Sequence, residues 1–489
     1  MMPLRERAAR VGVTLRERSE RVAISQGIQV TLIEALAAIY GVGVVTLFAS
    51  GRVDLLRAGL LLGGPVVFAV ALLRPEWTIL FMVVLPPSVS TSIPKLVLIA
   101  IMVAALFGFL FQGGLNLGPK TGIFPLVGII VLAMTMKADS PGTPVEADTL
   151  ESIIYYTLLV LVAFNAEANG RIRIDMFLNW LLVGLVAAAL LQPFASRIST
   201  FDTIYSNPFY GKFAYIGAMG FGVAYVRYSL TRSEGRRPSR LDAILAFAFL
   251  FITAIAFGRT AWLVVLLIFA LVSIWTSRKS FWIVSSVVVV FVLTIPIVGE
   301  RVLPGGIADV TSQARLERIT TGRSALWEEL WARGVEALPF GNGWGYVESL
   351  TPVELFGFES FVTDKNEFIY AHDDFLYLFV QLGLLGFGLL VAYWMNLFVK
   401  VRRLSRSPSE FVRYNVRVLV PVLIVEFMMQ LTANGFATQF VTDKAFMASG
   451  LVFGLHYAVR QAERLDVTGT QSLGASQRNR DGARSFARA

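Results

Sequence analysis

Long apolar runs, separated by short polar segments, repeat along most of this chain. An α-helix needs about 20 apolar residues to cross the hydrocarbon core of a membrane. The candidate spans are 28–48, 58–73, 76–88, 96–111, 121–136, 150–167, 174–192, 209–229, 241–257, 260–276, 281–298, 374–399, 414–434 and 444–459. The pattern predicts an all-α polytopic membrane protein with about 12 to 14 transmembrane helices. The number is a range because 76–88 is short and ends at Pro86 and Pro87, which also fits a re-entrant or partial helix.

Composition agrees with this class. The chain has 489 residues, of which 55% are hydrophobic and 16% charged, and its mean hydropathy is +0.65. That is too apolar for a soluble domain of this length. The absence of cysteine excludes disulfides, zinc–thiolate sites and thiol catalysis. The formal net charge is +9, but the arginines cluster between apolar runs, which indicates membrane topology and not nucleic-acid binding.

The basic segments predict an orientation. Arginine and lysine are concentrated in 227–240, 278–279 and 400–406, each two spans after the one before. Cytoplasmic loops carry an excess of basic residues. We therefore expect a multi-pass protein of the cytoplasmic (inner) membrane with both termini in the cytoplasm. The long segment 299–372 and the active site would face outside, toward the periplasm.

The remaining segments complete the expected organisation. Residues 1–27 are basic and too long for the basic region of a signal peptide; they favour either an amphipathic helix on the membrane surface or a solvated, disordered arm. Residues 460–489 are rich in Arg, Ser, Gly and Gln, which predicts a disordered cytoplasmic tail. Between them we expect transmembrane helices over 28–298 and 373–459, joined by an extracytoplasmic catalytic loop over 299–372.

Loop 299–372 is uncommonly long, and such loops are more often functional than not. Within it, 324–333 predicts a helix whose apolar face carries Trp327 and Trp331. A helix of this kind is typical of the outer membrane interface. The segment 340–345 is rich in glycine, and a tight structural turn is favoured there over a direct functional role.

Three residues form a candidate set for chemistry. Arg323 lies in the first turn of the predicted helix, where free N–H groups and a guanidinium suit a phosphate. Arg259 lies between two apolar runs, a costly place for a charge that indicates function, with snorkelling to the interface as the alternative. His372 lies where a polar stretch meets an apolar run, and an imidazole can take a proton from a hydroxyl near neutral pH.

The motifs around these residues resemble a known family. They are Thr-Gly-Arg-Ser-Ala-Leu-Trp at 321–327, Gly-Asn-Gly at 341–343, Ala-His-Asp-Asp-Phe-Leu-Tyr at 371–377 and Gln-Leu-Gly-Leu-Leu-Gly at 381–386. Together they are similar to the signature of the O-antigen ligase/polymerase superfamily of GT-C type membrane glycosyltransferases. The resemblance covers roughly 321–388, and Arg259 is similar to the family's arginine at the outer end of an earlier span.

The resemblance implies a glycan donor on polyprenyl (undecaprenyl) pyrophosphate, a glycan or lipid-glycan acceptor, and inverting transfer with no metal or other cofactor. His372 would be the general base, and Arg323 and Arg259 would bind the leaving pyrophosphate. The family usually has asparagine after the histidine, where this chain has Asp373. That aspartate could orient the imidazole or raise its pKa, and it could equally cap the next helix, which is the favoured interpretation.

Further residues are candidates for substrate contact. Lys212 and Tyr210 lie at the outer entrance of a span, where a lysine could contact phosphate or snorkel to the surface. Glu367 and Asp364 could contact sugar hydroxyls or the acceptor, with ordinary loop solvation as the alternative. The expected substrate-binding set is Arg259, Arg323, Lys212, Tyr210, Gly341, Gly343, Trp327, Asp373 and Glu367. The chain has no nucleotide-binding glycine loop and no aspartate-rich run, so a nucleotide-sugar donor is not expected.

Other classes of function stay open from the sequence. A polymerase and a ligase share the donor chemistry and differ in whose hydroxyl attacks. A flippase or other transporter of lipid-linked oligosaccharides can also have about fourteen spans, but it would be expected to show an internal repeat and charges deep in its spans. A membrane scaffold would not need a charged arginine at the membrane boundary together with a histidine at the end of a loop.

Overall fold

The structure, a computed structural model, describes residues 66–85, 95–118, 121–137, 144–195, 212–256, 259–276, 323–350, 373–432 and 439–486. Over these residues the chain consists of helices and their connections, and the β-type pairing found among them is one isolated bridge between Lys137 and Trp344. The prediction of an all-α protein is therefore confirmed.

Most predicted spans coincide with a helix. These helices are α3 (Pro75–Val84), α5 (Lys95–Phe111), α6 (Phe124–Thr135), α7 (Pro144–Ala168), α8 (Ile174–Ala195), α9 (Lys212–Ser233), α10 (Arg240–Ile255), α11 (Arg259–Thr276), α18 (Asp374–Leu404), α19 (Glu410–Thr432) and α20 (Gln439–Phe486). Two further helices, α15 (Arg323–Glu336) and α16 (Tyr346–Ser349), come between α11 and α18 in the chain. The predicted spans 28–48 and 281–298 lie outside the described residues.

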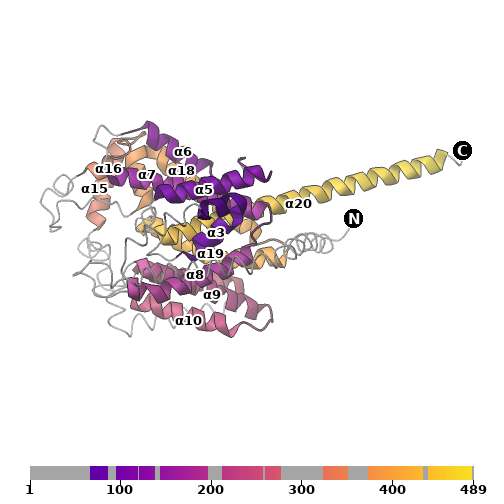
Figure 1. Cartoon of the computed structure of the whole chain (residues 1–489), viewed down its shortest axis with the longest axis horizontal. Helices are drawn as coiled ribbons and strands as arrows, with labels where there is room; N and C mark the ends of the chain where they lie inside the picture. The colour runs from indigo at the N-terminus through magenta and orange to yellow at the C-terminus, as the bar shows by residue number, and fades with distance from the viewer. Residues whose placement is uncertain are drawn as a thin grey trace.

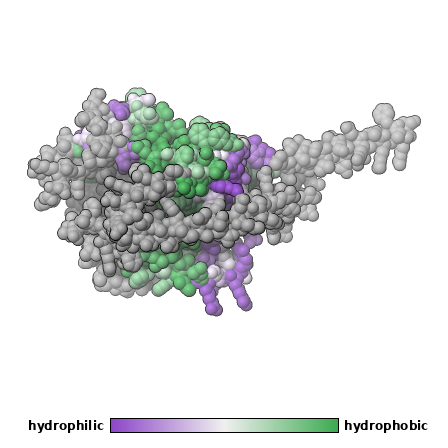
Figure 2. All heavy atoms as spheres, viewed as in Figure 1, coloured by the Kyte–Doolittle hydropathy of each residue, from purple (hydrophilic) through white to green (hydrophobic). Residues whose placement is uncertain are grey.

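The described helices have the apolar character of an integral membrane protein. By length and composition, α7, α8, α18 and α19 can cross a membrane, and α3, α5, α6 and α11 are shorter apolar helices. Figure 2 shows hydrophobic surface across the middle of the visible face, with hydrophilic residues toward the side from which α20 extends. With 10 residues, α3 rises only about 15 Å, about half of a hydrocarbon core, as expected of a partial helix at 76–88.

Glycines allow the closest helix packing in the bundle. Gly450 and Gly454 of α20 lie against the backbone of α7, where an added Cβ atom would collide with the carbonyl oxygens of Val160 and Phe164. Lipid tails are as apolar as the helices, so transmembrane helices associate through such close packing of small residues. These glycines therefore explain why α20 can lie directly along α7.

Contacts at the two ends of the bundle show which segments lie at each end. At one end Arg236, which follows α9, lies 3.6 Å from Glu410 at the start of α19, so the basic segment 227–240 meets the α18–α19 connection. At the opposite end of α19, the hydroxyls of Thr260 and Thr432 are 3.0 Å apart. Helices α15 and α16 and the start of α18 lie at this second end, away from the long extension of α20 (Figure 1).

The C-terminal segment differs from the prediction. Residues 460–489 were expected to be disordered, but α20 continues as a helix to Phe486 and extends beyond the bundle (Figure 1). No proline interrupts this helix, and Arg460 pairs with Glu463 at 3.3 Å, a spacing that favours helix. Composition alone therefore misled the prediction for this segment, while the predicted N-terminal segment 1–27 lies outside the described residues.

Candidate functional site

The residues predicted from the sequence fall into three groups. Outside the described residues lie His372, Glu367, Asp364 and Tyr210. The first residues of helices are Lys212 of α9, Arg259 of α11 and Arg323 of α15. Described with their surroundings are Trp327, Gly341, Gly343 and Asp373. The predicted helix after residue 323 is present.

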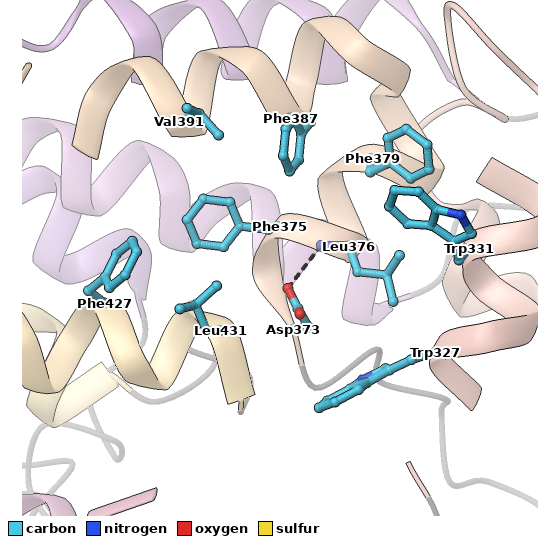
Figure 3. A pocket seen from close by; sticks show the side chains of 10 residues that line it. All are labelled: Trp327, Trp331, Asp373, Phe375, Leu376, Phe379, Phe387, Val391, Phe427 and Leu431. Carbon is cyan, nitrogen blue, oxygen red and sulfur yellow. Dashed lines mark hydrogen bonds between the residues drawn. The ribbon is translucent and has the colours of Figure 1, made fainter. Parts of the chain in front are cut away.

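A cavity of about 480 Å³ lies between α15, α18 and α19 (Figure 3). It is lined by Trp327, Trp331, Asp373, Phe375, Leu376, Phe379, Phe387, Val391, Phe427 and Leu431. The aromatic rings pack against one another across its walls: Trp331 stacks on Phe379 with ring centroids 4.8 Å apart, and Phe375 meets Phe427 edge-on at 5.9 Å. Within this lining Asp373 is the single charged residue, so the cavity is an apolar chamber with one carboxyl group at its edge.

Asp373 caps α18. Its backbone is extended, and its Oδ1 atom accepts a hydrogen bond from the backbone N–H of Leu376 at 2.9 Å (Figure 3). Burial raises the pKa of Asp373 to about 6, although hydrogen bonds from the N–H groups of Leu376 and Phe375 act in the opposite direction. The side chain is therefore a carboxylate at neutral pH, and the capping interpretation is confirmed.

Residues near two of the candidate catalytic residues in the chain line this cavity, and the residue after Arg259 lies next to a lining segment. Trp327 follows Arg323 by one helical turn, and Asp373 follows His372 directly. Leu431 precedes Thr432, which hydrogen-bonds Thr260, the residue after Arg259. Three segments far apart in sequence thus meet at one end of the bundle. Lys212 is not among the residues that line the cavity.

The glycine turn, residues 341–345, is built against a break in α18. Gly383 has φ of 62° and ψ of −152°, which interrupts the helix. The N–H of Asn342 donates to the Val380 carbonyl and that of Gly343 to the Gln381 carbonyl, both at 2.9 Å. These bonds satisfy carbonyl groups that a continuous helix would have satisfied itself. The interpretation of Gly341 and Gly343 as a structural turn is therefore supported.

Sequence reasoning gave no role to three polar residues beside this turn, although two of them stand in the motifs 371–377 and 381–386. Tyr377 and Gln381 lie one turn apart on α18, and both hydrogen-bond the buried carboxylate of Glu348 in α16. Two polar residues at this spacing in an apolar helix indicate a buried polar partner. The partner itself was not identifiable, because Glu348 lies 29 and 33 positions away.

The arrangement suits a ligand with an apolar chain and an anionic head. Helices α11 and α15 each begin at an arginine, and the first N–H groups of a helix have no partner within the helix and carry partial positive charge. The aromatic walls suit an apolar group. Among the residues that the structure describes, no group of three or more His, Asp or Glu side chains is arranged to hold a metal ion.

Residues 244–391 match the protein family described as O-antigen ligase. This region is less than a third of the chain and runs from α10 into α18, so it contains Arg259, Arg323 and the 371–377 motif. The match confirms the resemblance drawn from the motifs and supports a membrane enzyme that transfers glycans. No curated protein matches the chain.

Proposed function

We propose that this chain, which carries an O-antigen ligase family region over residues 244–391, transfers a glycan from polyprenyl pyrophosphate to an acceptor hydroxyl. The observation that carries the proposal is the aromatic cavity between α15, α18 and α19. Its lining includes the residue after His372 and a residue one turn after Arg323. An apolar chamber bordered by these residues fits a lipid-linked donor better than it fits a soluble nucleotide sugar.

The cavity would hold the part of the isoprenoid chain nearest the pyrophosphate. A volume of about 480 Å³ is within the usual range for ligand pockets, and each buried CH₂ group contributes about 0.8 kcal/mol. Trp327 and Trp331 of α15 form one wall and Phe427 of α19 forms part of the opposite wall (Figure 3). Seated there, the lipid would leave its charged head at the rim beside Asp373.

Arg323 and Arg259 would hold the pyrophosphate. A guanidinium can bind phosphate oxygens through two parallel hydrogen bonds, and the N-terminus of a helix adds free N–H groups. These donors would act most strongly as negative charge develops on the leaving group, so they would stabilise the transition state more than the bound donor. The negative charge of Asp373 would keep the anionic head toward the arginine side of the rim.

His372 would act as the general base. Its imidazole would take the proton of the acceptor hydroxyl while the hydroxyl oxygen forms a bond to the anomeric carbon of the donor sugar. The bond between that carbon and the pyrophosphate oxygen would break on the opposite face, and its electron pair would leave on the pyrophosphate. Attack from the face opposite the leaving group inverts the configuration, and the step requires no oxidant, metal or nucleotide.

The position of the basic segment 227–240 supports an outward-facing site. The basic segment 227–240 and the α18–α19 connection share one end, which the positive-inside bias assigns to the cytoplasm. The cavity lies at the other end. The donor glycan would accordingly be used on the outer face of the cytoplasmic membrane.

A transfer assay with the purified full-length protein tests this proposal. With a glycan on polyprenyl pyrophosphate and an acceptor, the wild type should form product, and the turnover of His372→Ala should fall by about 10²- to 10⁴-fold. Arg323→Ala and Arg259→Ala should each lose about 10²-fold. Excess EDTA should leave the rate unchanged. Full turnover in His372→Ala would rule out the assigned base, and use of a nucleotide sugar would contradict the proposed donor class.

The product of the same assay separates the two kinds of transferase. A polymerase lengthens the glycan on its own lipid carrier, and a ligase moves it to a different acceptor molecule. Mass analysis of the lipid-linked and released fractions therefore shows whose hydroxyl attacks.

A further inference from the structure

A buried carboxylate connects the glycine turn to the first segment of α18, residues 374–382. The Glu348 side chain accepts a hydrogen bond from the Tyr377 hydroxyl and another from Gln381 Nε2, the latter at 3.1 Å. Gln381 in turn accepts a hydrogen bond from the Gly345 N–H at 2.6 Å through its Oε1 atom. We call Glu348, Tyr377, Gln381 and the Gly345 N–H the Glu348 network.

The Glu348 network lies away from water. Glu348 is 6% exposed and Gln381 is fully buried, and Trp344 meets the Tyr377 ring edge-on at 5.6 Å. A buried polar group that loses its partner costs about 1–3 kcal/mol, and more when it is charged. The conformation that satisfies all of these groups is therefore strongly preferred, and it fixes the glycine turn and the first segment of α18 relative to each other.

This first segment of α18 leads directly to the catalytic candidate. The Tyr377 N–H donates to the Asp373 carbonyl at 2.9 Å, so the residue held by Glu348 also closes the first turn of the helix. Asp373 is part of the cavity lining and is bonded covalently to His372. A change in the direction of this segment would therefore move the attachment point of the proposed base.

We propose that Glu348 is a positioning residue for the transfer reaction, acting through Tyr377 and Gln381 on the start of α18, to which His372 is bonded through Asp373. The inference rests on the proposed function, because it takes His372 as the general base. Glu348 is buried and is not among the residues that line the cavity, so it would not touch the donor lipid seated there. Misplacement of a catalytic group by about 1 Å can cost on the order of 100-fold in rate.

The test exchanges the amide and the carboxylate between positions 348 and 381. In Glu348→Gln, the new amide has one acceptor oxygen where the carboxylate has two, so it cannot accept separately from the Tyr377 hydroxyl and from Gln381 Nε2. In Gln381→Glu, two carboxylates face each other in a buried site. The double variant E348Q/Q381E restores both hydrogen bonds described for position 348, because the amide at 348 can accept from Tyr377 and donate to the carboxylate at 381. That carboxylate can still accept from the Gly345 N–H.

The measurement is steady-state transfer by the purified full-length protein, which gives kcat per folded molecule and the KM for the donor. For Glu348→Gln we expect kcat to fall about 10- to 100-fold, with donor KM within about twofold of wild type. Gln381→Glu should lose more, and the double variant should regain most of the lost kcat. Glu336→Gln, at an exposed position of α15, is the matched control and should not change either constant.

The outcomes separate this inference from the function on which it rests. Wild-type turnover in His372→Ala would reject the assigned base. Loss of turnover in His372→Ala together with an unchanged kcat in Glu348→Gln would reject the positioning role and leave the proposed function standing. A Glu348→Gln protein with lower thermal stability and a normal kcat would have the same meaning. If Glu348→Gln does not fold, Tyr377→Phe replaces it, since it removes only the hydroxyl donor; an unchanged kcat in that variant would equally overturn the proposal.

Discussion

Helix α18 takes part in two buried polar networks that differ in what they satisfy. The Glu348 network at its beginning bonds to the backbone of the glycine turn. The second network lies deeper in the bundle, where Trp394 donates to Gln430 at 2.7 Å and Gln430 donates to Glu426 at 3.1 Å. We call this second set the Trp394 network. All three of its side chains are buried, as are those of the Glu348 network.

The two networks differ in whether the helix backbone beside them satisfies its own hydrogen bonds. The Trp394 network joins α18 to α19 where both helices satisfy their own backbone groups, so its loss weakens their attachment and leaves their course unchanged. The Glu348 network lies beside the break at Gly383, where α18 depends on the glycine turn for backbone partners. Its loss would redirect a helix beside the cavity. The first network should therefore govern turnover, and the second should govern stability.

The largest effect should come from the backbone junction itself. Gly341 has φ of +80°, and an added Cβ atom would collide with the backbone of Gly383 and Gln381. Strain and overlap together should make Gly341→Ala less stable by about 3 kcal/mol, with transfer activity lost. Thermal unfolding and the transfer assay measure both. Gly388→Ala, in α18, is the control, because its Cβ would meet nothing within 4 Å. A Gly341→Ala protein as stable and as active as this control would show that the close contact between Gly341 and Gly383 is not needed.

A smaller effect, on donor binding, is expected from a substitution that narrows the cavity beside α18. Phe387 lies after the break in α18, and Phe375 and Phe379 lie before it, yet all three face the same cavity (Figure 3). Phe387→Trp should raise the KM for the lipid-linked donor about tenfold, equivalent to about 1.4 kcal/mol of binding, and change kcat little. Leu384→Trp, at a half-exposed position outside the lining, should leave KM unchanged. Equal KM values in the two variants would argue against a donor site here.

For the Trp394 network we expect the opposite result to that for the Glu348 network: lower stability with unchanged turnover. Gln430→Met keeps the size of the side chain and removes its polar atoms, which leaves the Trp394 N–H and Glu426 short of partners. We expect a loss of about 1–2 kcal/mol in stability, seen as a lower melting temperature, with kcat per folded molecule unchanged. A fall in kcat as large as that of Glu348→Gln would remove the distinction between the two networks.

The smallest effect should be the pH dependence of stability that comes from the carboxyl group of Asp373, the N-cap of α18. Burial raises the pKa of Asp373 from its usual 3.8 to about 6, so the folded protein holds this proton more tightly than the unfolded chain does. Its contribution to stability is therefore present below pH 3.8 and is lost as the pH rises through 6. Asp373→Asn keeps a good cap and should abolish this dependence. Melting temperatures between pH 4 and pH 7 check it; identical pH profiles for both proteins would contradict the shifted pKa.

Much of the fold could be predicted because the length of an apolar run is a local property of the sequence. The predicted span 260–276 differs from α11 by one residue. The start of α15 at Arg323 and the cap at Asp373 were also predictable, since helix starts have local signals. The C-terminal extension of α20 was not, because polar composition indicates disorder even where neighbouring residues favour continued helix.

The site could be predicted only where its residues carry their own signal. His372, Arg259 and Arg323 were singled out because ionisable groups next to or within apolar runs are costly, and their roles stay predictions. The cavity wall supplied by Phe427 was not, because an aromatic residue in an apolar run looks the same whether it faces lipid or a ligand. The contacts of Glu348 were hidden for a different reason, since its partners come from a distant segment that meets it where the glycine turn packs on α18.

The most direct test of the central claim is photo-crosslinking of the donor lipid to the purified protein. The probe is a glycan on polyprenyl pyrophosphate with a diazirine in the isoprenoid units nearest the pyrophosphate, and unlabelled donor serves as competitor. We predict competable adducts on α15, α18 and α19 at Trp327, Phe387 and Phe427, and a marked loss of these adducts in Phe387→Trp. Competable adducts confined to helices that do not line the cavity, with none on these three, would contradict the account.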